Sequence, residues 1–76
     1  MEQVNKKETP EQRFKRIAEV RTNAVLDRLR ILGNLSNRQM YSYSEEDINK
    51  IFLAINKQIR EVRTKFNSVK QERFKL

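Results

Sequence analysis

Apolar residues recur along the first half of the chain at the spacing of an α-helix. At about 100° per residue they share one face. The members of this face are Phe14, Ala18, Val25, Leu29 and Leu32, with Ile17, Ala24 and Ile31 beside them. Thr9, Pro10 and Gln12 form a helix start, with a cap, a first-position proline and a capping box. Gly33 offers a left-handed residue to end the helix. The pattern predicts a helix over about residues 10–32.

A second helical pattern follows and is more regular. Its apolar residues are spaced alternately four and three apart, as in a heptad repeat. They are Ile48, Phe52, Ile55, Ile59, Val62, Phe66 and Val69. Ser44 is suited to cap this helix, acidic residues fill its first turn, and Tyr43 can pack on Ile48. We expect a helix over about residues 45–73, with its seam packed against other helices.

These two patterns predict an all-α protein: an antiparallel helical hairpin with a loop at residues 33–43. Residues 1–8 are polar and charged, which favours a disordered arm. A hairpin of this size cannot bury all the apolar surface that its two helices offer. We therefore expect the hairpin to assemble into a homo-oligomeric helical bundle, most simply a dimer with four helices.

Two arginines interrupt the apolar face of the first helix. Arg21 and Arg28 lie one heptad apart within that face. A guanidinium group cannot lose its charge, so on burial it needs an anion. The anion is either a carboxylate across an interface, such as that of Glu19 or Asp27, or a ligand. The first alternative gives a purely structural role or a helical inhibitor of a protein partner.

The loop offers further ligand-binding groups. A nucleotide could be held by amides, a guanidinium and a stacking ring. The candidates are Asn34, Asn37, Arg38 and Tyr41. The alternative is a structured corner, in which Asn and Ser side chains satisfy backbone groups while Leu35 and Met40 close the core.

Composition argues for binding rather than catalysis. The chain has no cysteine, no histidine and one glycine, so it offers no thiolate or imidazole metal site, no histidine base and no glycine-rich phosphate loop. We expect no enzymatic activity, no metal and no cofactor. No apolar run approaches the ~18 residues of a membrane span, and the N-terminus lacks the apolar core of a signal peptide. We therefore expect a cytoplasmic protein.

Net charge points to an anionic partner. The formal charge is +7, and residues 57–76 carry seven Lys/Arg against two Glu. Nucleotides, nucleic acids and acidic proteins all fit this charge. Binding to nucleic acid is the alternative to a small ligand. Its candidate residues are Lys57, Arg60, Arg63 and Lys70.

Three short patterns carry a resemblance to a known group of proteins. They are R-F-x-R-I-A-E-x-R from Arg13, L-G-N-L-S-N-R from Leu32, and Y-x-Y-[ST] from Tyr41. From Arg13 to about Ile55 the chain resembles a family of very short proteins encoded on phages and conjugative elements of low-GC Gram-positive bacteria. In size, helical content and charge it is also similar to phage sponges for cyclic nucleotide immune signals.

The resemblance implies a role on a mobile element in a bacterial host. Together with the residues above, it leads us to expect a non-enzymatic protein that sequesters an anionic nucleotide. The ligand would be a cyclic nucleotide-type signal of host antiphage defence. In this hypothesis Arg21, Arg28 and Arg38 hold phosphates, Asn34 and Asn37 bond base or ribose, and Tyr41 stacks.

Overall fold

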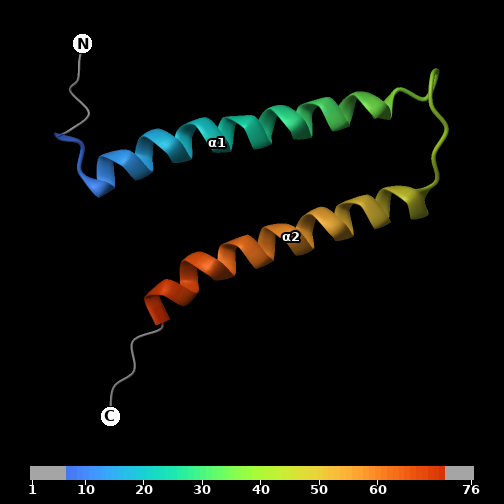
Figure 1. The fold of residues 1–76 in the computed structure, drawn as a ribbon. Coiled ribbons are helices and arrows are strands. Elements are labelled where there is room, and N and C mark those ends of the chain that lie inside the picture. Colours follow the sequence, from blue (N-terminus) through green and yellow to red (C-terminus); the bar gives the residue numbers. More distant parts are fainter. Residues whose placement is uncertain (1–6, 72–76) are drawn as a thin grey trace. The chain divides into compact units, whose positions relative to one another are not determined.

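The chain is all-helical over the part that the structure describes. The computed structural model describes the backbone of residues 7–71 and the side chains of residues 7–67. Residues 7–71 form helix α1 (Pro10–Gly33), the short 3-10 helix η2 (Asn34–Ser36) and helix α2 (Glu45–Gln71), with no strand (Figure 1). The all-α prediction is confirmed. Two compact units divide the chain: Met1–Tyr41 holds α1 and η2, and Ser42–Leu76 holds α2.

Helix α1 begins where its capping residues place it. Thr9 is extended, with φ −79° and ψ 163°, and its Oγ1 accepts a hydrogen bond from the Gln12 amide at 3.0 Å. The Gln12 Oε1 in turn accepts from the Thr9 amide at 3.0 Å. Pro10 occupies the first turn, where a missing N–H costs nothing. The predicted capping box is confirmed.

The end of α1 differs from the prediction. Gly33 belongs to the helix and has right-handed angles, φ −62° and ψ −21°. Asn34 also stays right-handed, and its amide donates to the carbonyls of Ile31 and Leu32. The chain tightens directly into η2, which satisfies the last carbonyls by itself. The prediction of a left-handed glycine cap at Gly33 is therefore wrong.

Helix α2 starts with a second reciprocal cap. The Ser44 Oγ accepts from the Asp47 amide, and an Asp47 carboxylate oxygen accepts from the Ser44 amide, both at 3.0 Å. Glu45, Glu46 and Asp47 fill the first turn, where the helix dipole favours negative charge. The predicted cap at Ser44 is confirmed. The described helix ends at Gln71, and residues 72 and 73 of the predicted helix lie outside the described residues.

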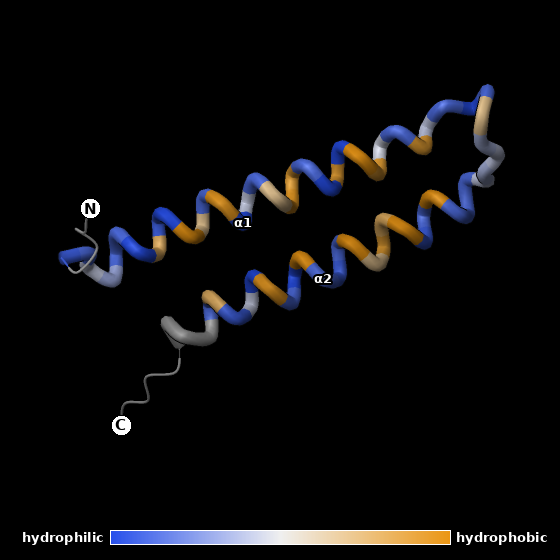
Figure 2. Tube along the Cα trace, turned by 45° about the horizontal axis from the view of Figure 1, so that its top comes forward, coloured by the Kyte–Doolittle hydropathy of each residue, from blue (hydrophilic) through white to orange (hydrophobic). Residues whose placement is uncertain are grey.

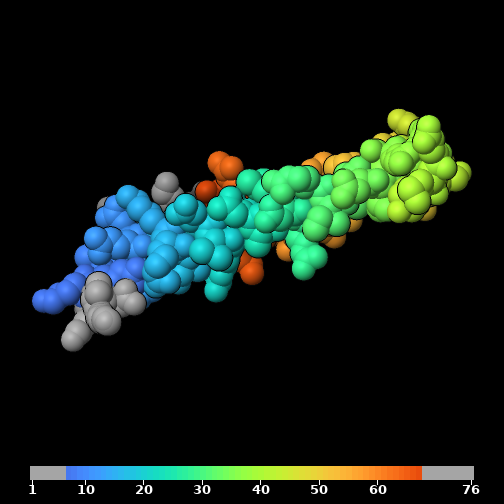
Figure 3. Space-filling model, turned by 90° about the horizontal axis from the view of Figure 1, so that it is seen from above, coloured from blue at the N-terminus to red at the C-terminus, as the bar shows by residue number. Residues whose placement is uncertain are grey.

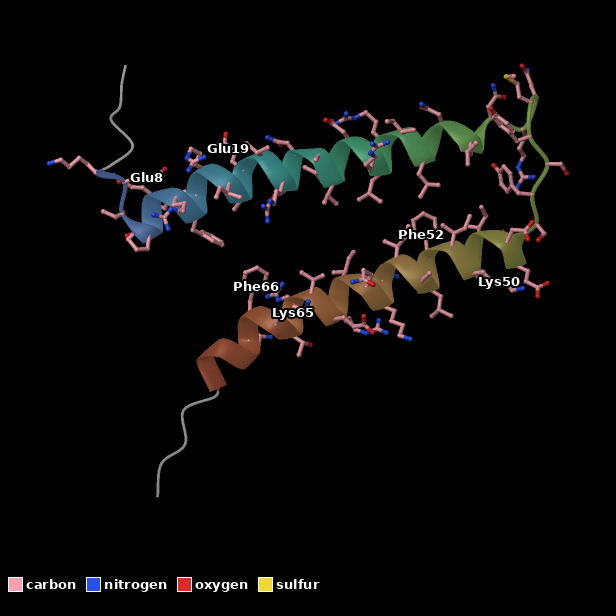
Figure 4. The ribbon with its side chains drawn as sticks, in the orientation of Figure 1. Glu8, Glu19, Lys50, Phe52, Lys65 and Phe66 are labelled. Atoms are coloured by element: carbon pink, nitrogen blue, oxygen red, sulfur yellow. The ribbon has the colours of Figure 1, made fainter. Side chains whose placement is uncertain are left out.

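Each helix carries its apolar residues at intervals of three and four, seen as recurring orange segments in Figure 2. On α2, Phe52 and Phe66 extend to one side of the helix and Lys50 to the other (Figure 4). Val69, the last predicted seam residue, lies outside the described side chains. None of the side chains described over residues 7–67 is fully buried. Phe14, Val25, Phe52 and Ile59, for example, are each about half exposed.

Candidate functional site

Arg21 and Arg28 lie on the apolar face of α1, as the heptad spacing predicts. A residue of a helix meets its neighbours three and four positions away. For Arg21 these are Ile17, Ala18, Ala24 and Val25, and for Arg28 they are Ala24, Val25, Ile31 and Leu32. Every such neighbour is apolar, so the helix itself offers neither guanidinium a carboxylate.

The structure gives Arg21 and Arg28 no hydrogen-bond or ion-pair partner among residues 7–67. Both side chains are exposed. A guanidinium presents five N–H donors in a planar fork, which matches a phosphate or carboxylate with two parallel hydrogen bonds. Arg21 and Arg28 thus place two permanent positive charges within an apolar surface. Their N–H donors are accessible to an external anion.

Cations away from this face behave differently. Arg30 pairs with Asp27 at 2.6 Å, and Lys15 pairs with Glu11 at 3.4 Å. In each pair the two residues lie three or four positions apart within α1. Arg21 and Arg28 differ from these two paired cations because they lie on the apolar face and have no carboxylate partner among the described residues.

The carboxylates proposed as interface partners are poorly placed for this task. Asp27 is engaged by Arg30 within its own helix. Glu19 precedes Arg21 by two residues, which puts it about 160° around the helix. The seam of α2 is apolar throughout its described length, from Ile48 to Phe66. These positions favour an anion from outside the chain.

Glu8 and Arg16 form an ion pair that sequence reasoning missed. The guanidinium donates from Nε at 2.7 Å and from Nη2 at 3.0 Å to the two carboxylate oxygens. The Glu8 side chain is 14% exposed, and these hydrogen bonds lower its pKa below the ordinary value of 4.5 despite desolvation. The same bonds raise the pKa of Arg16. Ordered contacts therefore reach into the segment predicted as an arm, whose residues 1–6 lie outside the described part.

The loop candidates are tied to the loop's own geometry. The Asn37 Oδ1 accepts from the Gln39 amide at 2.9 Å, and the Asn37 carbonyl accepts from the amides of Met40 and Tyr41. These bonds build the turn, as the structured-corner alternative predicts. The other part of that alternative is not seen, because Leu35 is 46% and Met40 is 71% exposed. The Tyr41 ring is 43% exposed and so remains available for stacking.

The six candidate residues form two groups rather than one cluster. Along a helix rising about 1.5 Å per residue, Arg21 and Arg28 are about 10 Å apart. Asn34 and Asn37 follow about 20 Å or more beyond Arg21 on the same scale. Within residues 7–67, neither Arg21 nor Arg28 forms a hydrogen bond or an ion pair with a loop residue. One copy of the chain therefore does not gather all six around a small ligand.

The alternative basic surface lies on α2. Lys57, Arg60 and Arg63 are exposed, and none has an ion pair within the described residues. The Arg60 carbonyl accepts from the Thr64 hydroxyl at 2.9 Å, which leaves the guanidinium unaffected. The side chain of Lys70 lies outside the described residues. These cations provide charge without the apolar setting that surrounds Arg21 and Arg28.

Figure 3 shows α1, in blue to green, with single side chains projecting from it. No described helix is long and apolar enough to cross a membrane. Among the side chains of residues 7–67, no three or more acidic, His or Cys side chains group together to hold a metal ion. Comparison with protein-family models, curated proteins and solved structures gave no match. A functional assignment therefore rests on the residues of this chain.

Proposed function

We propose that this protein binds an anionic nucleotide and holds it without converting it. One observation carries the proposal: Arg21 and Arg28 lie unpaired on an apolar face whose neighbouring positions hold no acid. Burial of that face in an assembly would enclose two permanent positive charges, which is costly unless an anion enters with them. Phosphate groups suit the guanidinium fork.

The complete site needs more than one copy of the chain. A helix presents a convex surface, so one α1 cannot enclose a ligand. We propose that the chain folds as a helical hairpin and that hairpins associate into a homo-oligomeric bundle. The exposed apolar residues of α1 and of the α2 seam support this, because contiguous apolar faces are buried in stable assemblies.

In this assembly the loop would act on the nucleoside part of the ligand. The Asn34 and Asn37 amides and the Arg38 guanidinium supply donors, and the exposed Tyr41 ring supplies a stacking surface. The residues proposed to contact ligand offer charge, hydrogen bonds and stacking, but no general base. Binding without turnover follows. The likeness to phage sponges in size, helical content and charge leads us to propose further that the ligand is a cyclic nucleotide-type signal of host antiphage defence.

A retention assay tests this function. A cyclic dinucleotide is mixed with the protein, passed through a membrane that retains protein, and recovered after heat denaturation. We expect stoichiometric retention and an unchanged ligand. Arg28→Ala should reduce retention, whereas Arg30→Ala should not, because Arg30 lies off the apolar face and is paired with Asp27. Recovery of a cleaved product, or equal retention by both variants, would refute the proposal.

Nucleic-acid binding is the second candidate, supported by the exposed Lys57, Arg60 and Arg63 of α2. Affinity for duplex DNA would then fall steeply with salt, since each phosphate contact releases counterions. It would depend on these three residues and be indifferent to Arg28→Ala. Salt-titrated binding of the same variants to a DNA duplex distinguishes this function from nucleotide binding.

A further inference from the structure

Around its two arginines, the apolar face of α1 has the same pattern when it is followed in either direction. Consider two antiparallel copies of α1 whose shared centre lies between Ala24 and Val25. Each residue of one copy then lies opposite the residue of the other copy for which the two residue numbers add to 49. Ile17 then meets Leu32, Ala18 meets Ile31, Ala24 meets Val25, and Arg21 meets Arg28. Six of the eight apolar residues of the face thus coincide with one another, and the two arginines coincide with each other. The other two, Phe14 and Leu29, fall opposite Leu35 and Val20, which are apolar but lie outside this face. Such a face is self-complementary for a second copy running antiparallel.

We propose that α1 pairs antiparallel with α1 of a second copy, about a two-fold axis beside Ala24 and Val25. Arg21 of each copy then lies opposite Arg28 of the other copy, and each such pair of arginines forms one anion site. This inference rests on the proposed function and specifies where its ligand binds. Neither site is complete without the second copy.

Side-chain size favours this arrangement. Ala24 lies at the proposed axis and Ala18 would meet the larger Ile31, so small and large side chains alternate across the interface. The interface would cover Val25 and Ile31, which are 57% and 56% exposed in the single chain. The second copy is therefore a partner that the face itself fits.

The arginines define the chemistry of the ligand. Four guanidinium groups near one axis repel one another until anions neutralise them. Arg21 and Arg28 are separated by about 10 Å along the helix, so the two anion sites are separated by a similar distance. The ligand class is a compound with two phosphate groups, one for each pair of arginines. Binding of that ligand and pairing of the helices must strengthen each other.

Cysteine cross-linking tests the orientation, because the chain has no cysteine of its own. In the antiparallel pair, Ala24 approaches Ala24 of the second copy, whereas the two Ala18 positions lie about 20 Å apart. A disulfide needs Cα atoms within about 7 Å. Ala24→Cys should therefore cross-link under mild oxidation, and Ala18→Cys, an equally mild change on the same face, should not. Asn23→Cys on the opposite face measures background.

Cross-linking of Ala18→Cys as fast as Ala24→Cys would show parallel pairing and overturn the proposal. Cross-linking of Ala24→Cys at the Asn23→Cys background would show that α1 does not pair with itself, and would also overturn it. Either result leaves the proposed function standing if the wild-type chain still retains nucleotide. If Ala24→Cys cross-links as expected but the wild-type chain does not retain nucleotide, the proposed function is refuted and the antiparallel pairing stands.

The coupling between ligand and pairing is measured with a hexose 1,6-bisphosphate, using the hexose 6-phosphate at equal ionic strength as control. The bisphosphate should raise the cross-linking rate of Ala24→Cys by at least about fivefold, and the monophosphate by less. In the Ala24→Cys, Arg28→Gln double variant, pairing should occur readily without anion and respond little to the bisphosphate. An unchanged rate with both sugars would refute a two-phosphate site.

Discussion

Helices α1 and α2 both carry an apolar face, but the two faces differ in what they contain. The described seam of α2 runs from Ile48 to Phe66 with apolar side chains at each heptad position. The face of α1 is interrupted at its centre by Arg21 and Arg28. A heptad seam of apolar residues needs only another apolar surface. In the proposed assembly, the face of α1 needs an apolar surface together with an anion.

If the proposed function is right, this difference separates residues that stabilise the protein from residues that bind its ligand. Substitutions in the α2 seam should act on folding and assembly. Substitutions at the arginines of α1 should act on ligand binding, because the arginines contribute little to packing and oppose burial. The two largest of four predicted effects test this division, and the two smaller ones test local features of the first unit.

Ile59→Asp should have the largest effect. Residue 59 lies in the middle of the α2 seam, and a charge there would be buried without a partner in the proposed assembly, at a cost of several kcal/mol. We expect loss of assembly and of most helical circular dichroism. Lys57→Ala, on the polar side of the same helix, should leave both nearly unchanged. Sedimentation of the wild-type chain as a stable helical monomer at micromolar concentration would contradict the role assigned to the seam.

Arg28→Ala should weaken nucleotide binding while sparing the fold. Loss of a charge-assisted hydrogen bond costs roughly 1.5–3 kcal/mol, which is at least a tenfold loss of affinity. Without ligand, the melting temperature should hold or rise, because repulsion and desolvation are relieved. Calorimetric titration and thermal melts of the same sample measure both effects, with Arg30→Ala as control.

The melts on Arg28→Ala also distinguish the two kinds of anion. If Arg28 pairs with an interface carboxylate instead of a ligand, its removal leaves that carboxylate buried and destabilises the protein by about 3–5 kcal/mol. A large fall in melting temperature without ligand would therefore assign Arg28 to the interface and not to the binding site. Both helices would then carry residues that stabilise the assembly, and the proposed difference between them would be wrong.

Gly33→Ala should stabilise the first unit slightly. Gly33 has right-handed helical angles, and a Cβ added there meets no atom within 4 Å. Alanine lowers the conformational entropy of the unfolded chain, so we expect a gain of about 0.4–1 kcal/mol in thermal or urea unfolding. A loss of stability would indicate a left-handed Gly33, as the sequence alone had suggested.

Glu8→Gln should have the smallest effect, and that effect should depend on pH. The pKa of Glu8 is lowered in the folded chain, so its stabilising contribution is present above the ordinary value of 4.5 and is lost as pH falls through the folded-state pKa. Melting temperatures of wild type and Glu8→Gln should differ at pH 7 and converge in acid. Glu11→Gln, which removes the more exposed ion pair between Lys15 and Glu11, serves as the control. A difference that is constant down to pH 3 would exclude the ion pair as its cause.

The helix starts were predictable because their causes are local. Thr9 with Gln12, and Ser44 with Asp47, each bond within three residues, so the pattern in the sequence is also the contact in the structure. Heptad spacing likewise placed Arg21 and Arg28 on one face. The end of α1 was less predictable, because glycine permits a left-handed cap without requiring one. Because α1 continues directly into the 3-10 helix η2, its end needs no left-handed residue.

The site could be predicted only as a set of residue types. The Glu8–Arg16 pair spans eight residues and depends on how the chain enters α1, which no periodic pattern records. Asn37 fits both a ligand contact and a turn, and the structure shows the turn. The separation of the arginines from the loop appears only when the length of the helix between them is taken into account.

The reciprocal caps have a kinetic consequence. The hydrogen bonds of the two caps, Thr9 with Gln12 and Ser44 with Asp47, join positions three apart. Each helix thus has its own nucleus at its N-terminal end and needs no distant segment to begin growing. Helix formation of this kind takes about a microsecond. Meeting a second copy depends on concentration and is the slower event, so the population of the binding-competent form would follow the rate of synthesis.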